Sequence, residues 1–265
     1  MRAADAWGLW YRSALRRQRD LAGRRTISEP VHYNLDDGIA TIRIDDGKRN
    51  AMAPVVIEGI NKALDRAEAD GAIVILTGRD DVFSAGFDLK VLNRGGSKAI
   101  GMLGGGYGLT RRVLNYPYPV ITACNGHVLA MGVFLMLSSD YIIGTRGDFK
   151  ISANEVAIGM PMPRTAAAVL GNRLNPADYQ RAVTLAEYFD VESALHAGFF
   201  DELVDTGELM NRAVSRAEAF KALDFEAHAT SKRRIRKTLS RKIRRSIPID
   251  LIEAGLIGLK NARRR

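Results

Sequence analysis

The sequence predicts an α/β protein whose body is followed by an all-helical region. Short apolar, β-branched runs alternate with stretches of helical period over the first part of the chain, and from Arg164 onward the pattern is helical almost throughout. A third observation is the segment 119–140, which has the pattern of a buried strand, a sharp turn and a buried helix. Alternation followed by a helical tail favours an α/β body with a helical appendage.

The first predicted elements are a hairpin, a helix and a buried strand. Residues 31–35 and 39–44 are predicted strands, because Asp36-Asp37-Gly38 between them is a hairpin signal. Pro54 opens a predicted helix in which apolar residues recur on one face. The unbroken apolar run 72–76 is typical of a strand that is covered on both faces.

The segment 119–140 contains a candidate anion site. Residues 120–124 are β-branched or small and form a predicted buried strand, which Asn125-Gly126 ends. The apolar run 130–137 predicts a helix that is buried on every side. Its first N–H groups have no partner inside the helix, so they suit a group that becomes negative during a reaction, such as a thioester oxygen turning into an enolate.

A second turn of the same design lies at residues 83–90, FSAGFDLK. An apolar lead-in is followed by small residues and by a predicted helix start, with Asp88 near its N-terminus. Residues 93–108 come next and hold seven glycines. We predict a mobile loop over a pocket there, because no strong strand precedes the segment as a phosphate-binding loop would require.

Beyond residue 140 the sequence predicts two short strands, at 141–144 and 149–151. Glu155 then opens an otherwise apolar run, which is an expensive place for a carboxylate unless it has a partner or a task. The remaining pattern predicts helices over 166–170, 176–186 and 191–197, a short link at 199–204, and three longer helices that begin at Gly207, Phe225 and Pro248.

Charge divides the chain into three regions. The 265 residues are 46% hydrophobic, enough for one large domain or one domain with an appendage. The net charge of +9 comes from the ends, because residues 1–25 carry seven arginines against two aspartates and residues 225–265 carry thirteen Lys or Arg against three acidic residues. We predict a basic amphipathic N-terminal extension over 1–25, a core over 26–204 and a helical region over 205–265.

Each basic end has competing interpretations. Residues 1–25 form a predicted basic amphipathic helix that docks on the body or on another subunit, binds a membrane or targets an organelle, or is disordered; docking or disorder is favoured. The run 232–245 raises RNA or anionic-membrane binding as a rival function. It has no interleaved aromatic residues, however, so nucleic acid is not the expected partner. An apolar stripe beneath the charges favours packing on another surface: Phe225, Ala229, Ile235, Leu239 and Ile243.

Other sequence features exclude several classes of site. Cys124 is the single cysteine and is expected to be a small core residue of a protein in a reducing compartment. The four histidines lack ligand spacing, so no metal is expected. His127 is interpreted as a structural hydrogen-bonding residue, and Asp140 as a cap or ion-pair partner at a strand start. The longest apolar run, 128–137, is about half of the roughly 20 residues that a membrane-spanning helix needs.

Three segments together resemble the crotonase family, also called the enoyl-CoA hydratase/isomerase family. They are FSAGFDLK (83–90), PVITACNGHVLAMGVFLMLSSDY (119–141) and NEVAIGMP (154–161), with weaker support from KRNAM (48–52) and the helical C-terminus. The resemblance covers roughly residues 30–225 in the right order and spacing. It implies a crotonase-like spiral of ββα units with a C-terminal helical oligomerisation region.

The resemblance also implies that the chain binds an acyl-CoA thioester and holds its oxygen with two backbone N–H groups. Carried over residue by residue, these belong to Phe87 and to Met131, the latter at a position where relatives usually have glycine. Methionine is tolerable there if its side chain points away from the site. The nucleotide side of coenzyme A would lie along Lys48, Arg49, Ala51, Ala85, Asp88 and Lys90. Coenzyme A is part of the substrate, and no separate cofactor is expected.

An acid/base site follows from the same resemblance. The hydratases of the family have two carboxylates, of which Glu155 matches the second, while Phe134, assigned to the acyl pocket, occupies the position of the first. Hydration needs a water molecule to be held and deprotonated while a proton is delivered to carbon. Moving a 3-enoyl double bond to the 2-position needs only one base, which takes the proton from C2 and returns it at C4.

We therefore expect an acyl-CoA isomerase in which Glu155 is the single acid/base. A hydratase that uses one glutamate and a non-catalytic acyl-CoA or RNA binder are the alternatives. The expected form is a cytoplasmic homotrimer or homohexamer, since the family assembles through its C-terminal helices. The basic run 232–245 would then serve assembly or the CoA phosphates of a neighbouring subunit.

Overall fold

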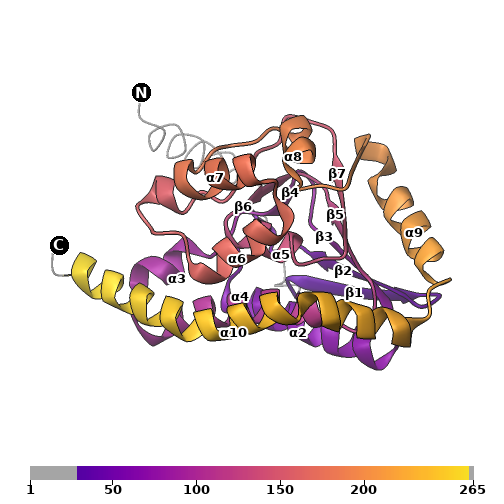
Figure 1. Cartoon of the computed structure of the whole chain (residues 1–265), viewed down its shortest axis with the longest axis horizontal. Coiled ribbons are helices and arrows are strands. Elements are labelled where there is room, and N and C mark those ends of the chain that lie inside the picture. The colour runs from indigo at the N-terminus through magenta and orange to yellow at the C-terminus, as the bar shows by residue number, and fades with distance from the viewer. Residues whose placement is uncertain (1–28, 263–265) are drawn as a thin grey trace.

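A computed structural model of the chain describes residues 29–262, with side chains to residue 258. The predicted N-terminal extension, residues 1–25, lies outside the described residues. A mixed α/β body comes first and a helical region follows it, as Figure 1 shows. The predicted fold class is confirmed at this level.

Six strands form the main sheet. In sheet order they are β1 (Val31–Asp36), β2 (Ile39–Ile44), β3 (Ile73–Thr77), β5 (Val120–Cys124), β7 (Tyr141–Thr145) and β9 (Glu202–Val204). β1 and β2 pair antiparallel across the predicted turn at 36–38, and the pairs from β2 to β9 are parallel. β3 and β5 are buried along their whole length, which is why each is an unbroken apolar run.

A small sheet of three parallel strands runs beside the main sheet and gives the chain its repeat. Its strands are β4 (Val82–Ser84), β6 (His127–Leu129) and β8 (Ile151–Ser152). Each follows one main-sheet strand in the chain. A helix comes next in each case: α3 (Leu89–Arg94) with α4 (Gly96–Asn115), then α5 (Met131–Met136), and then α6 (Arg164–Arg173) after the short 3₁₀ helix η1 (Val156–Ile158). This succession is the predicted spiral of ββα units.

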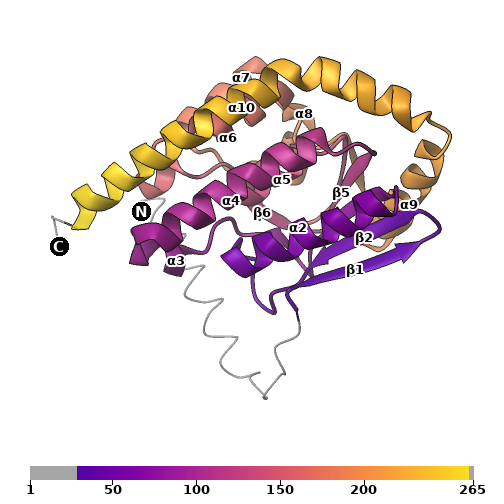
Figure 2. The same ribbon diagram turned by 90° about the horizontal axis from the view of Figure 1, so that it is seen from below.

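Helices cover both faces of the main sheet. On one face, α9 (Leu209–Phe220) packs its buried leucine and alanines against strand isoleucines, after the short 3₁₀ helix η2 (Thr206–Glu208). On the other face lie α2 (Pro54–Ala69), α4 and α10 (Phe225–Ala262), which run side by side in Figure 2. α7 (Pro176–Leu185) and α8 (Val191–Ala197) lie between α6 and β9 in the chain. The larger apolar core fills the space between the sheets and these helices.

The predicted mobile loop at 93–108 is wrong, because most of this segment belongs to α4. Gly106 shows why glycines occur in a buried helix: a Cβ added there would lie 2.5 Å from the ring of Phe87 and 3.2 Å from the sulfur of Met131. Each glycine costs the helix about 1 kcal/mol relative to alanine. Here the loss is offset by close packing of α4, which buries Met102, Leu103 and Tyr107.

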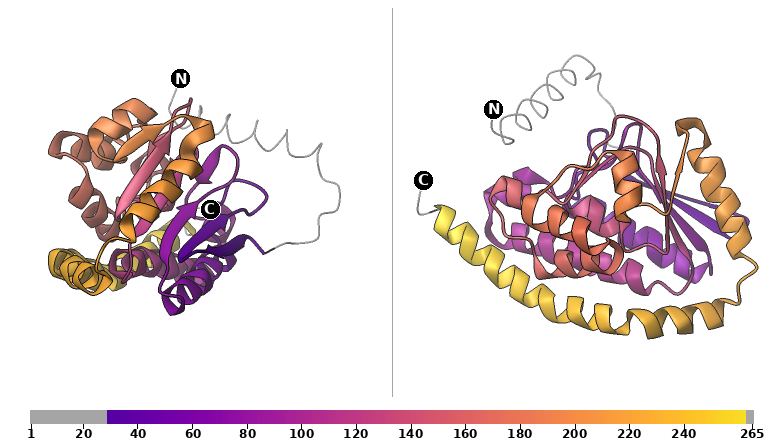
Figure 3. Two further views of the ribbon diagram at one scale, coloured as in Figure 1. Left: turned by 90° about the vertical axis from the view of Figure 1, so that its right-hand side faces the viewer. Right: turned by 45° about the horizontal axis from the view of Figure 1, so that its top comes forward.

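The prediction of three C-terminal helices is also wrong. The first begins at Leu209, and the other two are one continuous helix, α10, with Pro248 in its interior. A proline inside a helix removes one hydrogen bond and costs about 3 kcal/mol, so a break is the reasonable expectation from sequence. Figure 3 shows α10 as one long helix that follows the body, and buried contacts on both sides of Pro248 hold it there.

Two further expectations need correction. The link predicted at 199–204 contains β9, the last strand of the main sheet, and β6 was not predicted because it is only three residues long. In the expected apolar stripe of the basic run, Leu239 and Ile243 are buried, but Ile235 is 81% exposed. The stripe is therefore narrower than helical spacing suggested.

Buried polar contacts fasten α10 to the body. The Nζ of Lys232 lies 2.6 Å from a carboxylate oxygen of Asp140, and Arg236 pairs with the other oxygen at 3.1 Å. Asp140 also accepts a hydrogen bond from the backbone N–H of Val120 at the start of β5. The interpretation of Asp140 as a pairing residue at a strand start is confirmed, and part of the basic run serves this internal contact.

Candidate active site

A small apolar hollow lies where the predicted motifs meet. It encloses about 40 Å³, room for one or two water molecules. Larger surface hollows of about 400 and 250 Å³ exist, but neither gathers these motifs. The small hollow is lined by Ala85, Phe87, Leu89, Leu92, Leu103, Tyr107, Ala130, Asn154, Glu155, Ile158, Met160 and Pro163. Glu155 is the one carboxylate among these lining residues.

The two predicted turns approach each other at the hollow. Gly86 has a φ of 88°, and a Cβ added to it would lie 3.4 Å from the backbone nitrogen of Met131 and 3.1 Å from the carbonyl oxygen of Leu129. Within the part of the chain that the structure describes, the N–H groups of Phe87 and Met131 donate no hydrogen bond to another residue. Two free donors on adjacent turns can bind one oxygen atom that carries negative charge.

The side chains of both donor residues leave the turns in the same direction. Phe87 and Met131 each reach the Gly106 position of α4, at the contact distances given above. Met131 is fully buried there, so its thioether is packed in the core. The methionine side chain therefore points away from the turn and leaves the backbone N–H of Met131 free there, which is the condition stated for methionine at this position.

The second turn is strained. Ala130, the residue before α5, has φ 48° and ψ −122°, a conformation that alanine rarely adopts. Its N–H is held by the carbonyl of Ser152 at 2.8 Å. Backbone strain of this kind costs about 1–3 kcal/mol and is concentrated at functional sites.

Glu155 brings a buried, poorly solvated carboxyl group to the hollow. It precedes η1, is 5% exposed, and its Oε2 atom has no hydrogen-bond partner. Burial raises the pKa of the Glu155 carboxyl from 4.5 to about 7, and a hydrogen bond to its own backbone only partly opposes this. A carboxyl group with a pKa near neutrality can both take and return a proton.

The structure changes the interpretation of two aromatic residues, one that was not predicted at the site and one that was. Tyr107 was missed, because the glycine-rich context of residues 93–108 favoured a loop; it lines the hollow from α4. Its apolar neighbours at helical spacing, Met102 and Leu103, were the signal available in the sequence. Phe134, assigned to the acyl pocket, lies on α5 with 1% exposure and is not among the residues that line the hollow.

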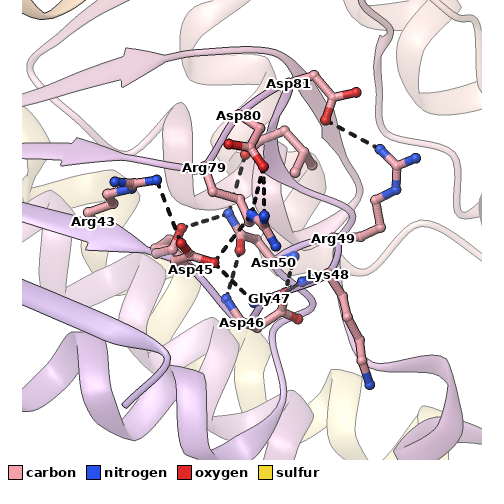
Figure 4. Close-up of polar contacts among 12 residues, drawn as sticks. Arg43, Asp45, Asp46, Gly47, Lys48, Arg49, Asn50, Arg79, Asp80 and Asp81 are labelled. Atoms are coloured by element: carbon pink, nitrogen blue, oxygen red, sulfur yellow. Dashed lines mark hydrogen bonds and ion pairs between the residues drawn. The ribbon is translucent and has the colours of Figure 1, made fainter. Parts of the chain in front are cut away.

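The residues assigned to the nucleotide part of coenzyme A lie on the surface loops next to the turns. Figure 4 shows the Lys48 side chain pointing away from the ion-paired cluster of Asp45, Arg79 and Asp80. Arg49 pairs with Asp81 at 3.5 Å. Two positively charged side chains beside the hollow suit the phosphates of a nucleotide.

Asn50 fixes this loop to the small sheet and was not singled out from sequence. It is fully buried, and its Nδ2 donates to the carbonyl oxygens of Ile44, Val82 and Phe83 at 2.8–3.2 Å. Its φ of 52° is a conformation that asparagine tolerates better than most residues. The signal in the sequence was an asparagine after Gly47 in a polar turn, which alone predicts only a turn.

The remaining assigned residues surround the first turn. The N–H of Ala85 donates to the carbonyl of Arg49, and Met52, next to Ala51, donates to the carbonyl of Gly86. Asp88 caps α3 by accepting from the N–H of Lys90 at 2.7 Å. Lys90 itself is exposed. The structure thus brings all the assigned residues except Phe134 to one region, and it leaves coenzyme A contacts to be tested.

Other candidate groups have structural contacts. His127 accepts a hydrogen bond from the N–H of Lys150 through its Nδ1 at 3.0 Å. Within residues 29–262 no cluster of His, Cys, Asp and Glu is arranged to hold a metal ion. None of the helices in that range combines the length and the hydropathy needed to cross a lipid bilayer.

Comparison with known proteins identifies the family to which this fold belongs. The fold is a spiral of ββα units, and two turns with free N–H groups lie beside a hollow that contains a buried carboxyl group. The model of the enoyl-CoA hydratase/isomerase family matches residues 34–252, and the chain belongs to this family.

Three similar proteins illustrate the range of relatives. A probable enoyl-CoA hydratase of Mycobacterium avium is 30% identical over 198 residues, which are 73% of this chain and 76% of the relative. An enoyl-CoA hydratase/isomerase family protein from Pseudomonas syringae is 43% identical, with a TM-score of 0.83 over 85% of this chain and 98% of the other. An enoyl-CoA isomerase of Mycobacterium tuberculosis is 42% identical, with a TM-score of 0.82 over 85% of this chain and 99% of the other.

Proposed function

We propose that this protein moves the double bond of a 3-enoyl-CoA thioester to the 2-position, with Glu155 as its single acid/base. The observation that carries the proposal is the hollow, which is lined by one buried carboxyl group and no second carboxylate and lies beside two turns with free backbone N–H groups. Family membership supports an acyl-CoA enzyme, and both hydratases and isomerases occur among the similar proteins.

The proposed reaction has two balanced proton transfers. The Glu155 carboxylate takes a proton from C2, and the electrons of the broken C–H bond form a dienolate whose charge lies on the thioester oxygen. The N–H groups of Phe87 and Met131 stabilise that oxygen. Glu155 then returns the proton to C4, the double bond forms between C2 and C3, and the thioester carbonyl is restored.

The apolar surroundings favour return of the proton over addition of water. Leu103, Ile158 and Met160 line the hollow. The resemblance to the family puts Phe134, which is fully buried, at the helix position where a hydratase has its other carboxylate. Addition of water would need a second polar group to hold and deprotonate the water molecule. Excluding bulk water also protects the enolate from side reactions.

The proposal includes the binding mode and the assembly. Lys48, Arg49, Ala51, Ala85, Asp88 and Lys90 contact the nucleotide part of coenzyme A, and no separate cofactor takes part. The chain works as a homotrimer or homohexamer in the cytoplasm, with residues 26–204 as the catalytic core and 205–265 as the assembly region. Small-angle scattering and sedimentation of the full chain test the oligomer.

The experiment is incubation with 3-enoyl-CoA and with 2-enoyl-CoA, with identification of the products. We expect isomerisation to be faster than hydration in the wild type, and Glu155→Gln to lower its rate by about 10²–10⁴-fold. Faster hydration than isomerisation by the wild type contradicts the proposal, and a fully active Glu155→Gln places the site elsewhere.

A further inference from the structure

A tyrosine hydroxyl shares the hollow with Glu155. Tyr107 follows the glycines of α4 and is 3% exposed. Its ring packs edge-on against Phe87, with 5.8 Å between the ring centroids. Gly106 lets α4 approach closely enough to Phe87 for this contact. The ring is thus fixed by the same residue that supplies one of the two free N–H groups.

Neither the Oε2 atom of Glu155 nor the Tyr107 hydroxyl has a hydrogen-bond partner among the described residues. The Oε2 atom of Glu155 is buried and unpaired. The Tyr107 hydroxyl is not one of the fully buried unpaired atoms, but it makes no hydrogen bond to the residues that the structure describes. A buried tyrosine hydroxyl usually has a partner, and a buried unpaired carboxylate oxygen costs about 1–3 kcal/mol or more. The two groups therefore have a strong tendency to bond to each other, directly or through a water molecule in the hollow.

Electrostatics limits the tyrosine to one role. Burial and then the negative charge of Glu155 and of Asp250 raise the pKa of Tyr107 far above its ordinary value. The hydroxyl therefore stays protonated at any pH where the protein functions. It can donate a hydrogen bond to an anion, but it cannot serve as a second base.

We propose that Tyr107 is a positioning residue of the site, whose hydroxyl donates a hydrogen bond to the unpaired Glu155 carboxylate and orients it for proton transfer. This inference rests on the proposed function for its kinetic consequence, but the contact itself does not. The hydroxyl turns toward Glu155 while the carboxylate is charged. When Glu155 has taken the proton from C2, the bond weakens and the carboxyl group is free to turn toward C4.

The other charged groups near the pair are already satisfied. Asp250 of α10 accepts hydrogen bonds from the backbone N–H groups of Arg164 and Thr165, both at 2.9 Å, and lies 3.7 Å from the Arg164 guanidinium. The carboxylate of Asp250 therefore has donors without the Tyr107 hydroxyl. Among the described residues, only burial and the backbone of Glu155 itself shift the pKa of that carboxyl clearly. A change in its titration on altering Tyr107 thus reports on their contact.

The test is Tyr107→Phe, which removes the hydroxyl and keeps the ring against Phe87. Because a hydrogen bond to the charged form lowers a carboxyl pKa, its loss should raise the pKa of Glu155 by about one unit. Isotope-edited infrared or NMR titration of the glutamate carboxyls, assigned with Glu155→Gln, measures this without any substrate. The same shift is expected in the acid limb of the pH dependence of kcat/KM, with kcat about ten-fold lower and KM little changed.

Tyr33→Phe is the matched control, because its hydroxyl bonds to Asp70 away from the hollow. It should leave both the titration and the kinetics unchanged. An unaltered Glu155 titration in Tyr107→Phe would overturn the proposal and leave the tyrosine a packing residue. A shifted titration in a protein that does not isomerise 3-enoyl-CoA would keep the contact and reject the proposed function.

Discussion

The turn at residues 85–87 and the turn at residues 129–131 each carry one free N–H beside the hollow, but only the first takes its conformation from glycine. Gly86 has a φ of 88°, whereas Ala130 holds a φ of 48° against its preference. A Cβ on Gly86 would lie 2.8 Å from the methyl group of Ala130. Only one of the two facing positions can carry a methyl group, so glycine is required in one turn because alanine occupies the other.

This difference shows how a strained backbone turn can keep its conformation when contacts on both sides hold it. The strained turn is fixed from both sides, by the bond from the Ala130 N–H to Ser152 and by the side chain of Met131, which is packed at Gly106. The glycine turn needs less support. Its neighbour Phe87 is partly exposed, whereas Met131 is fully buried.

Of the changes that test this comparison, Gly86→Ala is expected to lower activity the most. The added methyl group meets Ala130 and the carbonyl of Leu129, so one turn must move and the two N–H groups no longer converge. Loss of one such donor lowers kcat by about 10²–10³-fold. Gly95→Ala is the matched control: its φ of 66° is similarly strained, but nothing lies within 4 Å of the new methyl group. Equal losses of activity in both variants would contradict the steric explanation.

The effect of the Glu155 carboxyl group on stability can be measured independently of the two turns. The pKa of this group is raised from 4.5 to about 7, so the folded state binds the proton more tightly than the unfolded state does. The contribution of Glu155 to stability is therefore most favourable below pH 4.5, falls as the pH rises toward 7, and stays lower above it, by about 3 kcal/mol for a shift of this size. Glu155→Gln should be more stable than the wild type at pH 8 and lose this advantage as the pH falls toward 4.5.

Urea unfolding at several pH values measures that difference. Glu202→Gln is the control of opposite sign. Burial by itself raises the pKa of Glu202, but hydrogen bonds from Arg212, Tyr141 and Arg216 together outweigh it and lower the pKa. The substitution should destabilise the protein at pH 8. A wild type that is as stable as Glu155→Gln throughout would show that Glu155 has an ordinary pKa. Activity that stays constant from pH 8 to pH 5 would say the same of the working enzyme.

Gly106→Ala disturbs both turns together, through the side chains that meet at α4. The new methyl group would lie 2.5 Å from the Phe87 ring. Forced repacking of this kind costs about 1–3 kcal/mol. Gly101→Ala, on the same helix with nothing within 4 Å, should instead stabilise the protein by up to about 1 kcal/mol. Chemical denaturation compares them, and equal signs for the two variants would reject the close-packing role of Gly106.

The smallest expected effect comes from making the two turns alike. Ala130→Gly relieves the strained φ but makes the unfolded chain more flexible, so the net stabilisation is about 1 kcal/mol or less. Ala123→Gly, in the middle of buried β5, is the control and should destabilise. Thermal unfolding distinguishes them. A loss of stability in Ala130→Gly would mean that its methyl packing outweighs the strain.

Much of this architecture could be predicted because it is encoded locally. The hairpin at 36–38, the buried runs of β3 and β5 and the helix from Pro54 each depend on residues close together in sequence. The two turns were also recognisable, since small residues between a strand and a helix have few other uses. Glu155 stood out because a carboxylate in an apolar run needs a reason.

The features that sequence missed depend on distant contacts. The sequence of α4 resembles a loop, because the reason for its glycines is the packing of Phe87 and Met131 against Gly106. Tyr107 was missed because its segment was predicted to be a loop. Pro248 breaks a helix by its own chemistry, but packing on the body overrides that preference. Phe134 lies one helical turn beyond Met131 and was assigned to the pocket, although its side chain is buried elsewhere in the core.

The contacts of α10 also bear on the order in which the protein is completed during synthesis. Lys232 and Asp250 bind groups 92 and 85 residues earlier in the chain, at Asp140 and at the start of α6. A ribosome that has released only the first 220 residues has supplied both turns and Glu155, yet Asp140 still lacks its buried cations and α6 its cap. Contacts of such sequence separation form late and slowly. The hollow can thus be assembled early, but the helices α4 and α6 around it are fastened only when the last helix packs against them.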